Sequence, residues 1–327
     1  MAMSMIRFDL RVPEFAPTTH AEQYATCLEM CEWAERLGFA AAVLSEHHGT
    51  DDGYLPAPLP FASAILARTT QLAVNVAAVI LPLHDPVRLA EECAVIDNIA
   101  PGRLSLVVAI GYRAAEFEMA GVEKRGRGAL LEEYVGVMRH AWTGEPFEWR
   151  GREIRVTPKP ATPGGPMLMV GGSTPKAARR AARLRCGFFP GSSDPEILTA
   201  YEDEAAKAGF AEGFCSLPSG PGFVMVSKDP EATWAQIGRH ALFDAQTYAS
   251  WQEGTHENVT DVHGASAWED VRASGVYRVV TPDECVALVE SQDGSVMLHP
   301  LMGGIPADLA WESLELFESD VLPRIGS

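Results

Sequence analysis

The sequence predicts an α/β protein, with a single (β/α)8 barrel (a TIM barrel) as the expected architecture. Short apolar runs without polar alternation, such as Phe39–Ser45, recur along the chain and are typical of parallel strands covered on both faces. Helical stretches separate these runs, and eight βα units can be counted. No change in composition marks a domain boundary, so residues 1–327 are expected to form one barrel domain. A doubly wound open sheet is the alternative.

Local sequence signals indicate where individual helices begin and end. Thr19 caps a helix that Gly38 ends, and Asp85-Pro86 opens another with proline in its first turn. The predicted strands are 6–10, 39–45, 72–81, 104–110, 166–170, 187–190, 222–226 and 295–298. The predicted helices include 19–37, 60–68, 85–101, 113–142, 173–184 and 306–322, with others between the later strands.

Two segments interrupt this alternation. Residues 145–165 are rich in glycine, proline and charge, which indicates a surface excursion with a small hairpin. Residues 250–276 are polar and irregular, and a loop this long in a compact domain is usually functional or mobile. We expect long loop insertions at the C-terminal face of the barrel, where 250–276 forms either a lid or a floppy insertion.

The composition restricts the partners. The formal net charge is -18, with 44 acidic and 26 basic residues, and an acidic surface repels nucleic acid and anionic membranes. The six cysteines form no CxxC pair and no zinc-like cluster, so they are expected to be reduced thiols. No secretory signal or membrane-spanning run is visible, which predicts a cytoplasmic protein.

Two adjacent histidines, His47 and His48, directly follow the second predicted strand. In a barrel, catalytic groups lie at the carboxyl ends of the strands, and a histidine there can act as a general base near neutral pH. The pair can also ligate a metal, but adjacent side chains diverge and no third ligand is evident, so no metal site is predicted. Alternatively, one histidine faces the mouth and the other packs structurally.

The segment Val170-Gly171-Gly172-Ser173-Thr174-Pro175 ends a strand and opens a helix. Glycines allow the backbone to approach a phosphate, and the start of a helix presents free N–H groups. The two hydroxyl side chains can donate as well. A tight βα turn without a ligand is the alternative interpretation.

Five segments resemble the bacterial-luciferase-like flavin oxidoreductase family. They are AERLGFAAAVLSEHHGTDDGYLPAPL (34–59), VAAVILPLHDPVRLAEECAVIDNIAPGRLSLVVAIGY (76–112), PMLMVGGSTPKAARRAARL (166–184), YRVVTPDECVALVE (277–290) and PLMGGIPADLAWESLELFESDVLPRI (300–325). They cover nearly the whole chain in the right order. Each motif is moderately specific, and their ordered combination is highly specific.

The resemblance implies roles for particular residues. His47 matches the family's base in oxygen chemistry, and His48 is its neighbour. Ala77-Ala78 matches a place where many members have a cis peptide beside the flavin ring. The implied phosphate contacts are Gly171, Gly172, Ser173 and Thr174, and Tyr112 can line the ring.

One departure concerns the cofactor. Relatives often carry an arginine at the end of the fourth strand that reaches the phosphate, where this chain has Ile110. Arg113 can supply the charge, or backbone amides alone can hold the phosphate. The departure is also compatible with a preference for the deazaflavin F420.

The resemblance therefore implies an enzyme, a two-component monooxygenase that acts on a small organic substrate with O2. It would use reduced FMN from a separate flavin reductase, since no Rossmann GxGxxG follows a predicted strand. A homodimer is expected. The alternatives are an F420-dependent reductase or dehydrogenase and a non-catalytic flavin-binding barrel.

Overall fold

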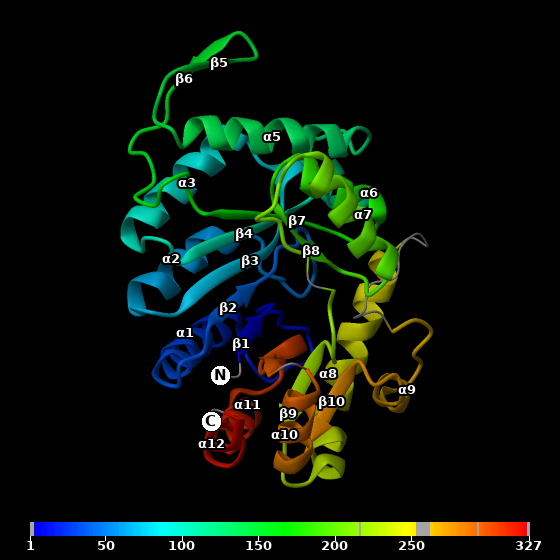
Figure 1. Ribbon diagram of the computed structural model, residues 1–327. Coiled ribbons are helices and arrows are strands. Elements are labelled where there is room, and N and C mark those ends of the chain that lie inside the picture. Colours follow the sequence, from blue (N-terminus) through cyan, green and yellow to red (C-terminus); the bar gives the residue numbers. More distant parts are fainter. Residues whose placement is uncertain (1–2, 216, 253–261, 293, 326–327) are drawn as a thin grey trace. The chain divides into compact units, whose positions relative to one another are not determined.

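The computed structural model describes residues 3–215, 217–252, 262–292 and 294–325 (Figure 1). The chain divides into two compact units. The first contains residues 1–43, 50–56 and 219–327, and the second contains residues 44–49 and 57–218. Both units are built from parallel strands and helices, which confirms the predicted α/β class.

Apart from one antiparallel hairpin in the second unit, the strands pair in parallel within each unit. The first unit holds β1 (Met3–Phe8), β9 (Phe223–Val226), β10 (Tyr277–Val280) and β11 (Ser295–Leu298); the second holds β3 (Ala73–Ile80), β4 (Leu104–Ala109), β7 (Met167–Gly172) and β8 (Gly187–Pro190); β2 (Ala41–Leu44) has residues in both. The strand order is β11-β1-β2 and, separately, β9-β10 in the first unit, and β3-β4-β7-β8 in the second. β10 was not predicted as a strand, because polar residues 250–276 precede it directly.

The helices follow the strands as the alternation predicted. The first unit contains α1 (His20–Arg36), α8 (Pro230–Trp251), α9 (Trp268–Ala273), α10 (Pro282–Ser291), α11 (Ala307–Leu316) and α12 (Leu322–Ile325); the second contains α2 (Pro58–Arg68), α3 (Pro86–Ile99), α4 (Ala114–Ala120), α5 (Arg127–Ala141), α6 (Pro175–Arg183) and α7 (Pro195–Lys207). The predicted caps are confirmed. Thr19 accepts a hydrogen bond from the Glu22 amide in a full capping box, and Asp85 accepts from Val87 and Arg88.

The predicted long helix 113–142 is wrong. It is two helices, α4 and α5, because Gly121 and Gly126 both adopt left-handed conformations with φ of 65° and 85°. Glycine adopts this conformation without a steric cost, so the first residue ends α4 and the second precedes α5. The break makes α4 a separate short helix directly after β4.

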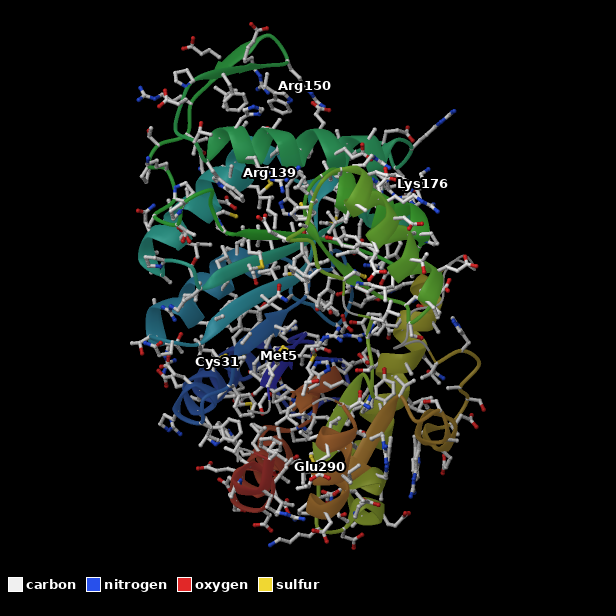
Figure 2. All side chains as sticks on the ribbon, viewed as in Figure 1. Met5, Cys31, Arg139, Arg150, Lys176 and Glu290 are labelled. Carbon is white, nitrogen blue, oxygen red and sulfur yellow. The ribbon has the colours of Figure 1, made fainter. Side chains whose placement is uncertain are left out.

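The predicted hairpin in residues 145–165 is confirmed. It pairs β5 (Phe147–Trp149) with β6 (Arg152–Ile154) in antiparallel register and projects beyond α5 in Figure 1. Arg150 lies at its turn, as Figure 2 shows, and forms an ion pair with Glu133 of α5. The hairpin is therefore tied to the helix that precedes it.

The predicted loop 250–276 is only partly irregular. Helix α8 continues to Trp251, and α9 occupies residues 268–273. The part of the prediction that falls on residues 253–261 lies outside the described residues. Among the described residues, no helix combines the length and the apolar character needed to cross a membrane.

Candidate functional site

The candidate site lies in the second unit, where its strands end. Residues 45–48 follow β2, Ile80 ends β3, and Ala109 ends β4. Because β3 and β4 run in parallel, their carboxyl ends lie at the same edge of the sheet. The predicted site residues at this edge are joined by hydrogen bonds.

His47 is held between two side chains from the segment after β4. Its Nδ1 lies 2.8 Å from Oε1 of Glu116, and its Nε2 lies 3.3 Å from the hydroxyl of Tyr112. An ionised carboxylate only accepts, so Nδ1 carries the proton and Nε2 presents its lone pair to Tyr112. Burial lowers the pKa of His47, although the bond to Glu116 opposes this effect. The imidazole therefore favours its neutral form, in which Nε2 carries a lone pair.

Glu116 is the centre of this network. Its Oε1 also accepts from the amide of His48 at 3.1 Å and from Nη1 of Arg113 at 3.1 Å. Burial opposes ionisation of this carboxyl, but the hydrogen bond from His47 and the charge of Arg113 keep its pKa below the ordinary value. Oε2 of Glu116 is buried and has no hydrogen-bond partner among the described residues. It therefore remains an acceptor for a donor that none of the described residues supplies.

A second carboxylate, Glu46, joins the ends of β2 and β3. Its Oε1 lies 2.6 Å from Nε2 of His48 and 2.8 Å from Nε2 of His84, and its Oε2 accepts from the amide of Ile80 at 3.0 Å. Burial raises the pKa of Glu46, but the hydrogen bonds from the two histidines outweigh it and bring the pKa to about 2. His48 and His84 thus share one ionised carboxylate, and His48 points away from the His47 network.

The peptide bond between Ala77 and Ala78 is cis, as the resemblance implied. The register between β3 and β4 shifts at this point, between Ala77 and Val79. The Ser45 hydroxyl donates to the carbonyl of Ala77 at 2.9 Å. Ser45 and Glu46 therefore bind β3 on both sides of the irregularity, which ties this backbone to the histidine segment.

The Gly-Gly-Ser-Thr turn lies where β7 ends and α6 begins. The Thr174 side chain accepts from the amide of Ala177 and caps the helix. A Cβ on Gly172 would lie 2.6 Å from Cβ of Ala177, so only glycine fits between the strand and the helix. One on Gly171 would lie 3.0 Å from Val107 of β4. The turn thus sits beside the end of β4, with close backbone packing and a helix N-terminus.

Three arginines of the second unit have defined partners near the site or on α6. Arg113 is committed to Glu116 and to the carbonyl of His48. Arg127 of α5 donates through Nε to the carbonyl of Gly111, next to Ile110, at 3.1 Å. Arg180 of α6 is buried and pairs with Glu132 at 2.9 Å. Hence Arg127 is the guanidinium bound at the end of β4.

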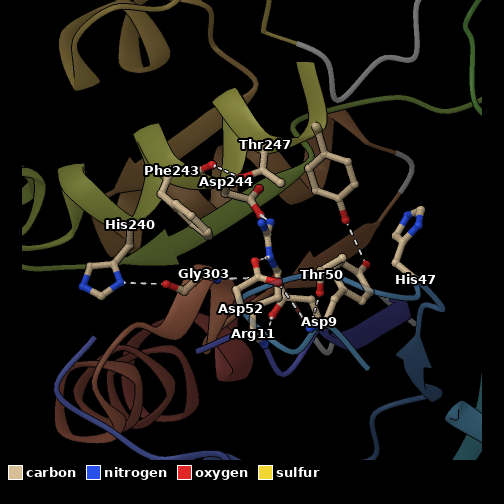
Figure 3. Close-up of polar contacts among 12 residues, drawn as sticks. Asp9, Arg11, His47, Thr50, Asp52, His240, Phe243, Asp244, Thr247 and Gly303 are labelled. Atoms are coloured by element: carbon tan, nitrogen blue, oxygen red, sulfur yellow. Dashed lines mark hydrogen bonds and ion pairs between the residues drawn. The ribbon is translucent and has the colours of Figure 1, made fainter. Parts of the chain in front are cut away.

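The first unit contains a separate buried ion network, which Figure 3 shows. Arg11 is fully buried, and its guanidinium lies 2.6 Å from Asp52 and 2.5 Å from Asp244. Tyr277 donates to the other oxygen of Asp244 at 2.6 Å. Burial, the largest influence, raises the pKa of Asp9 to about 7 beside these charges. Arg11 is thus paired with two carboxylates, although its buried Nη2 has no hydrogen-bond partner among the described residues, and the arrangement is typical of a structural ion cluster.

Sequence reasoning missed Glu116 and the partnership of Glu46 with His84. Glu116 was hidden inside the predicted long helix, although it is the acidic residue in the first turn after β4. The pairing of His84 with Glu46 was not predicted, although His84 follows the third predicted strand. Its position directly after β3, at the same edge as His48, is the signal that could have joined the two.

The fold and the geometry of the site together define a class of protein. Parallel βα units carry a buried histidine–carboxylate pair at the carboxyl edge, together with a glycine-rich turn at a helix N-terminus. Residues 7–290 match the model of the luciferase-like monooxygenase family. The chain belongs to this family and is an oxidoreductase of the monooxygenase type, which confirms the resemblance read from the sequence.

Individual relatives agree with this assignment. A protein of Sinorhizobium fredii without an assigned function is 30% identical, with 94% of this chain and 93% of the relative covered. The alkanal monooxygenase alpha chain of Photorhabdus luminescens is 23% identical, with 95% and 93% covered. The oxygenase component of the flavin-dependent trigonelline monooxygenase of Acinetobacter baylyi is 26% identical, over 51% of this chain and 48% of the relative.

Solved structures share the fold. A monooxygenase of Streptomyces bottropensis superposes with a TM-score of 0.78 at 23% identity, covering 98% of this chain and 99% of the other. The oxygenating constituent of 3,6-diketocamphane monooxygenase of Pseudomonas putida, solved with FMN, gives 0.72 at 18% identity, covering 99% and 98%. An F420-dependent secondary alcohol dehydrogenase gives 0.71 at 16% identity, covering 99% of both chains.

Proposed function

We propose that this protein is the oxygenase component of a two-component monooxygenase, which uses reduced FMN and O2 on a small organic substrate. The observation that carries the proposal is the buried His47–Glu116 pair, whose Nε2 faces the Tyr112 hydroxyl. Membership in the luciferase-like monooxygenase family supports the reaction class.

The residues present fit a flavin. Gly171–Thr174 would hold the phosphate with backbone amides and hydroxyls at the start of α6. Ala77 and Ala78 would lie against the ring, because their small side chains allow the backbone to approach closely. The unpartnered Oε2 of Glu116 would accept a ring N–H. Reduced flavin, when bound, supplies the electrons that activate O2.

In this proposal, side chains of the protein transfer the proton and limit the access of water. His47 would accept or return a proton at Nε2, while Glu116 fixes the ring and stabilises its charged form. His47 is only 8% exposed, so the proton is handled in a site with little water. His48 would not touch the flavin directly, since its imidazole is bound to Glu46. We keep His47 as the proposed catalytic base and assign His48 a supporting role.

The partners are part of the same proposal. Two relatives are named as the oxygenating part of a larger system, which supports a separate flavin reductase as the source of reduced FMN. We further propose that residues 1–327 form one closed (β/α)8 barrel domain that acts as a cytoplasmic homodimer.

A second candidate is an F420-dependent reductase or dehydrogenase. Ile110 favours it, because the strand-end arginine expected near an FMN phosphate is absent, and an F420-dependent dehydrogenase shares the fold. Hydride transfer would then replace oxygen activation, and Arg127 would be the cation nearest the end of β4.

Parallel titrations with reduced FMN and reduced F420 under anaerobic conditions test the choice. We expect tight binding of reduced FMN and much weaker binding of F420. The reverse order would overturn the monooxygenase proposal. Exposure of the FMN complex to O2 should then oxidise the flavin, and His47→Ala should slow product formation with any accepted substrate. Unchanged turnover in His47→Ala would exclude the base role and favour a non-catalytic barrel.

A further inference from the structure

We propose that Glu46, His48 and His84 form a binding site for one divalent transition-metal ion, with Zn²⁺ or Co²⁺ as occupant. Oε1 of Glu46 and the Nε2 atoms of the two histidines all lie within 4.8 Å of one another. Two imidazoles and one carboxylate are a frequent ligand set for these ions. The sequence alone offered no third ligand for a metal, because His84 follows a different strand.

The separations are compatible with a metal after a small movement. The hydrogen-bonded atoms lie 2.6 and 2.8 Å apart, whereas ligands at about 2.0–2.2 Å from one zinc ion are separated by roughly 3.0–3.5 Å. An opening of about half an ångström therefore admits the ion in place of the two hydrogen bonds. The side chains of His48 and His84 are 18% and 28% exposed, so they have room to move.

The third ligand is fixed by the fold. The Glu46 side chain is completely buried, and its Oε2 accepts from the amide of Ile80 at 3.0 Å. A backbone donor of this kind holds a ligating carboxylate in one orientation, as the partners of metal ligands commonly do. Glu46 thus presents Oε1 from a fixed position, and the two histidines adjust around it.

The types of ligand atom favour particular ions, and the number of ligands leaves the bound ion accessible to water. Imidazole nitrogen suits Zn²⁺, Co²⁺ and Ni²⁺, whereas Mg²⁺ and Ca²⁺ prefer oxygen ligands. Three protein ligands leave at least one position for water, and the partial exposure of both histidines gives the ion a path from solvent. His47 is outside this cluster, since its Nδ1 lies against Glu116 and its Nε2 lies against Tyr112.

Titration of the full-length, tag-free, flavin-free protein with CoCl2 and ZnCl2 after chelator treatment tests the site. We expect one ion per chain by calorimetry and a visible absorption band from bound Co²⁺. His84→Gln and His48→Gln should each weaken binding at least tenfold. The matched control is His140→Gln, since His140 is an exposed histidine of α5 and should leave the affinity unchanged.

The absence of stoichiometric binding would overturn the proposal, as would affinity that persists in both glutamine variants. Circular dichroism confirms that each variant is folded, and if one variant does not fold, the other carries the test. MgCl2 provides a further check, because equal affinity for Mg²⁺ would contradict an imidazole site. The experiment uses no flavin, so its result is independent of the oxygenase proposal.

Discussion

At the scale of single residues, one carboxylate oxygen organises the candidate site. Oε1 of Glu116 receives the His47 ring, the His48 amide and the Arg113 guanidinium. These three donors fix which nitrogen of His47 carries a proton, since an ionised carboxylate cannot donate. The second oxygen of Glu116 stays unpartnered among the described residues. In the proposed mechanism Glu116 would therefore position His47 through Oε1, while Oε2 would be available to the cofactor.

Glu116→Gln should lower the turnover number by roughly 10²-fold, because a neutral amide no longer stabilises the charged imidazole. We expect KM to change little, because the substrate pocket is not altered. Nitrogen NMR of His47 provides an independent readout, since the proton should redistribute between Nδ1 and Nε2. Glu118→Gln is the matched control on an exposed position of α4. An unchanged NMR spectrum together with unchanged turnover would contradict the role.

Ser45→Ala should weaken FMN binding several-fold, because the Ala77 carbonyl loses its hydroxyl donor beside the proposed ring position. The free energy of unfolding should fall by about 1 kcal/mol, the usual contribution of one hydrogen bond. Ser63→Ala removes a comparable hydroxyl-to-carbonyl bond within α2 and is the control. Fluorescence titration with FMN distinguishes the two variants. Equal FMN affinities would show that Ser45 only stabilises the fold.

At the scale of elements, the lengths of the helices decide where the site residues lie. Gly121 ends α4 after seven residues, and Gly126 precedes α5. Glu116 therefore lies in a short helix, where its carboxylate contacts His47 and His48. The parallel pairing of β4 with β7 places Gly171 next to Val107 and Ala109. If residues 113–142 formed one continuous helix, the chain after Gly121 would follow a different direction from that of α5.

Gly172→Ala should lower the free energy of unfolding by about 1–3 kcal/mol, because the new Cβ would overlap Ala177 and separate α6 from β7. Cofactor affinity should fall as well if the turn binds the phosphate. Gly136→Ala is the control in α5, where nothing lies within 4 Å, and it should stabilise the protein by up to about 1 kcal/mol. Urea unfolding measures both changes. A neutral Gly172→Ala would indicate that the helix shifts freely.

At the scale of the whole molecule, the two units differ in how they pair their buried charged side chains. The second unit places its buried carboxylates at a strand edge, where they bind histidines. The first unit surrounds Arg11 with two aspartates and with the rings of Tyr54, Phe243, Tyr248 and Trp251. Charges buried this deeply persist only when each is paired, so this network should be central to stability.

Arg11→Met should reduce the free energy of unfolding by about 3–5 kcal/mol, because it leaves Asp52 and Asp244 buried without their cation. Arg272→Met is the control in the same unit. It removes an exposed ion pair with Glu231, which solvent screens, so the free energy of unfolding should change far less than in Arg11→Met. Chemical denaturation measures both variants. Similar values for the two would mean that the buried network contributes no more than a surface pair.

The sequence by itself determined the α/β class, most element positions, the family, and the location of His47 and the glycine turn. These features depend on local order along the chain: apolar runs, caps and short motifs. Only the tertiary structure decided which residues form hydrogen bonds with one another at the site. Glu116, His84 and Arg127 reach the site from elements that follow other strands. Pairing between such residues depends on strand register and on where each helix ends, and neither is encoded in a local pattern. The break between α4 and α5 differs, because Gly121 and Gly126 are a local signal that the predicted helix 113–142 did not take into account.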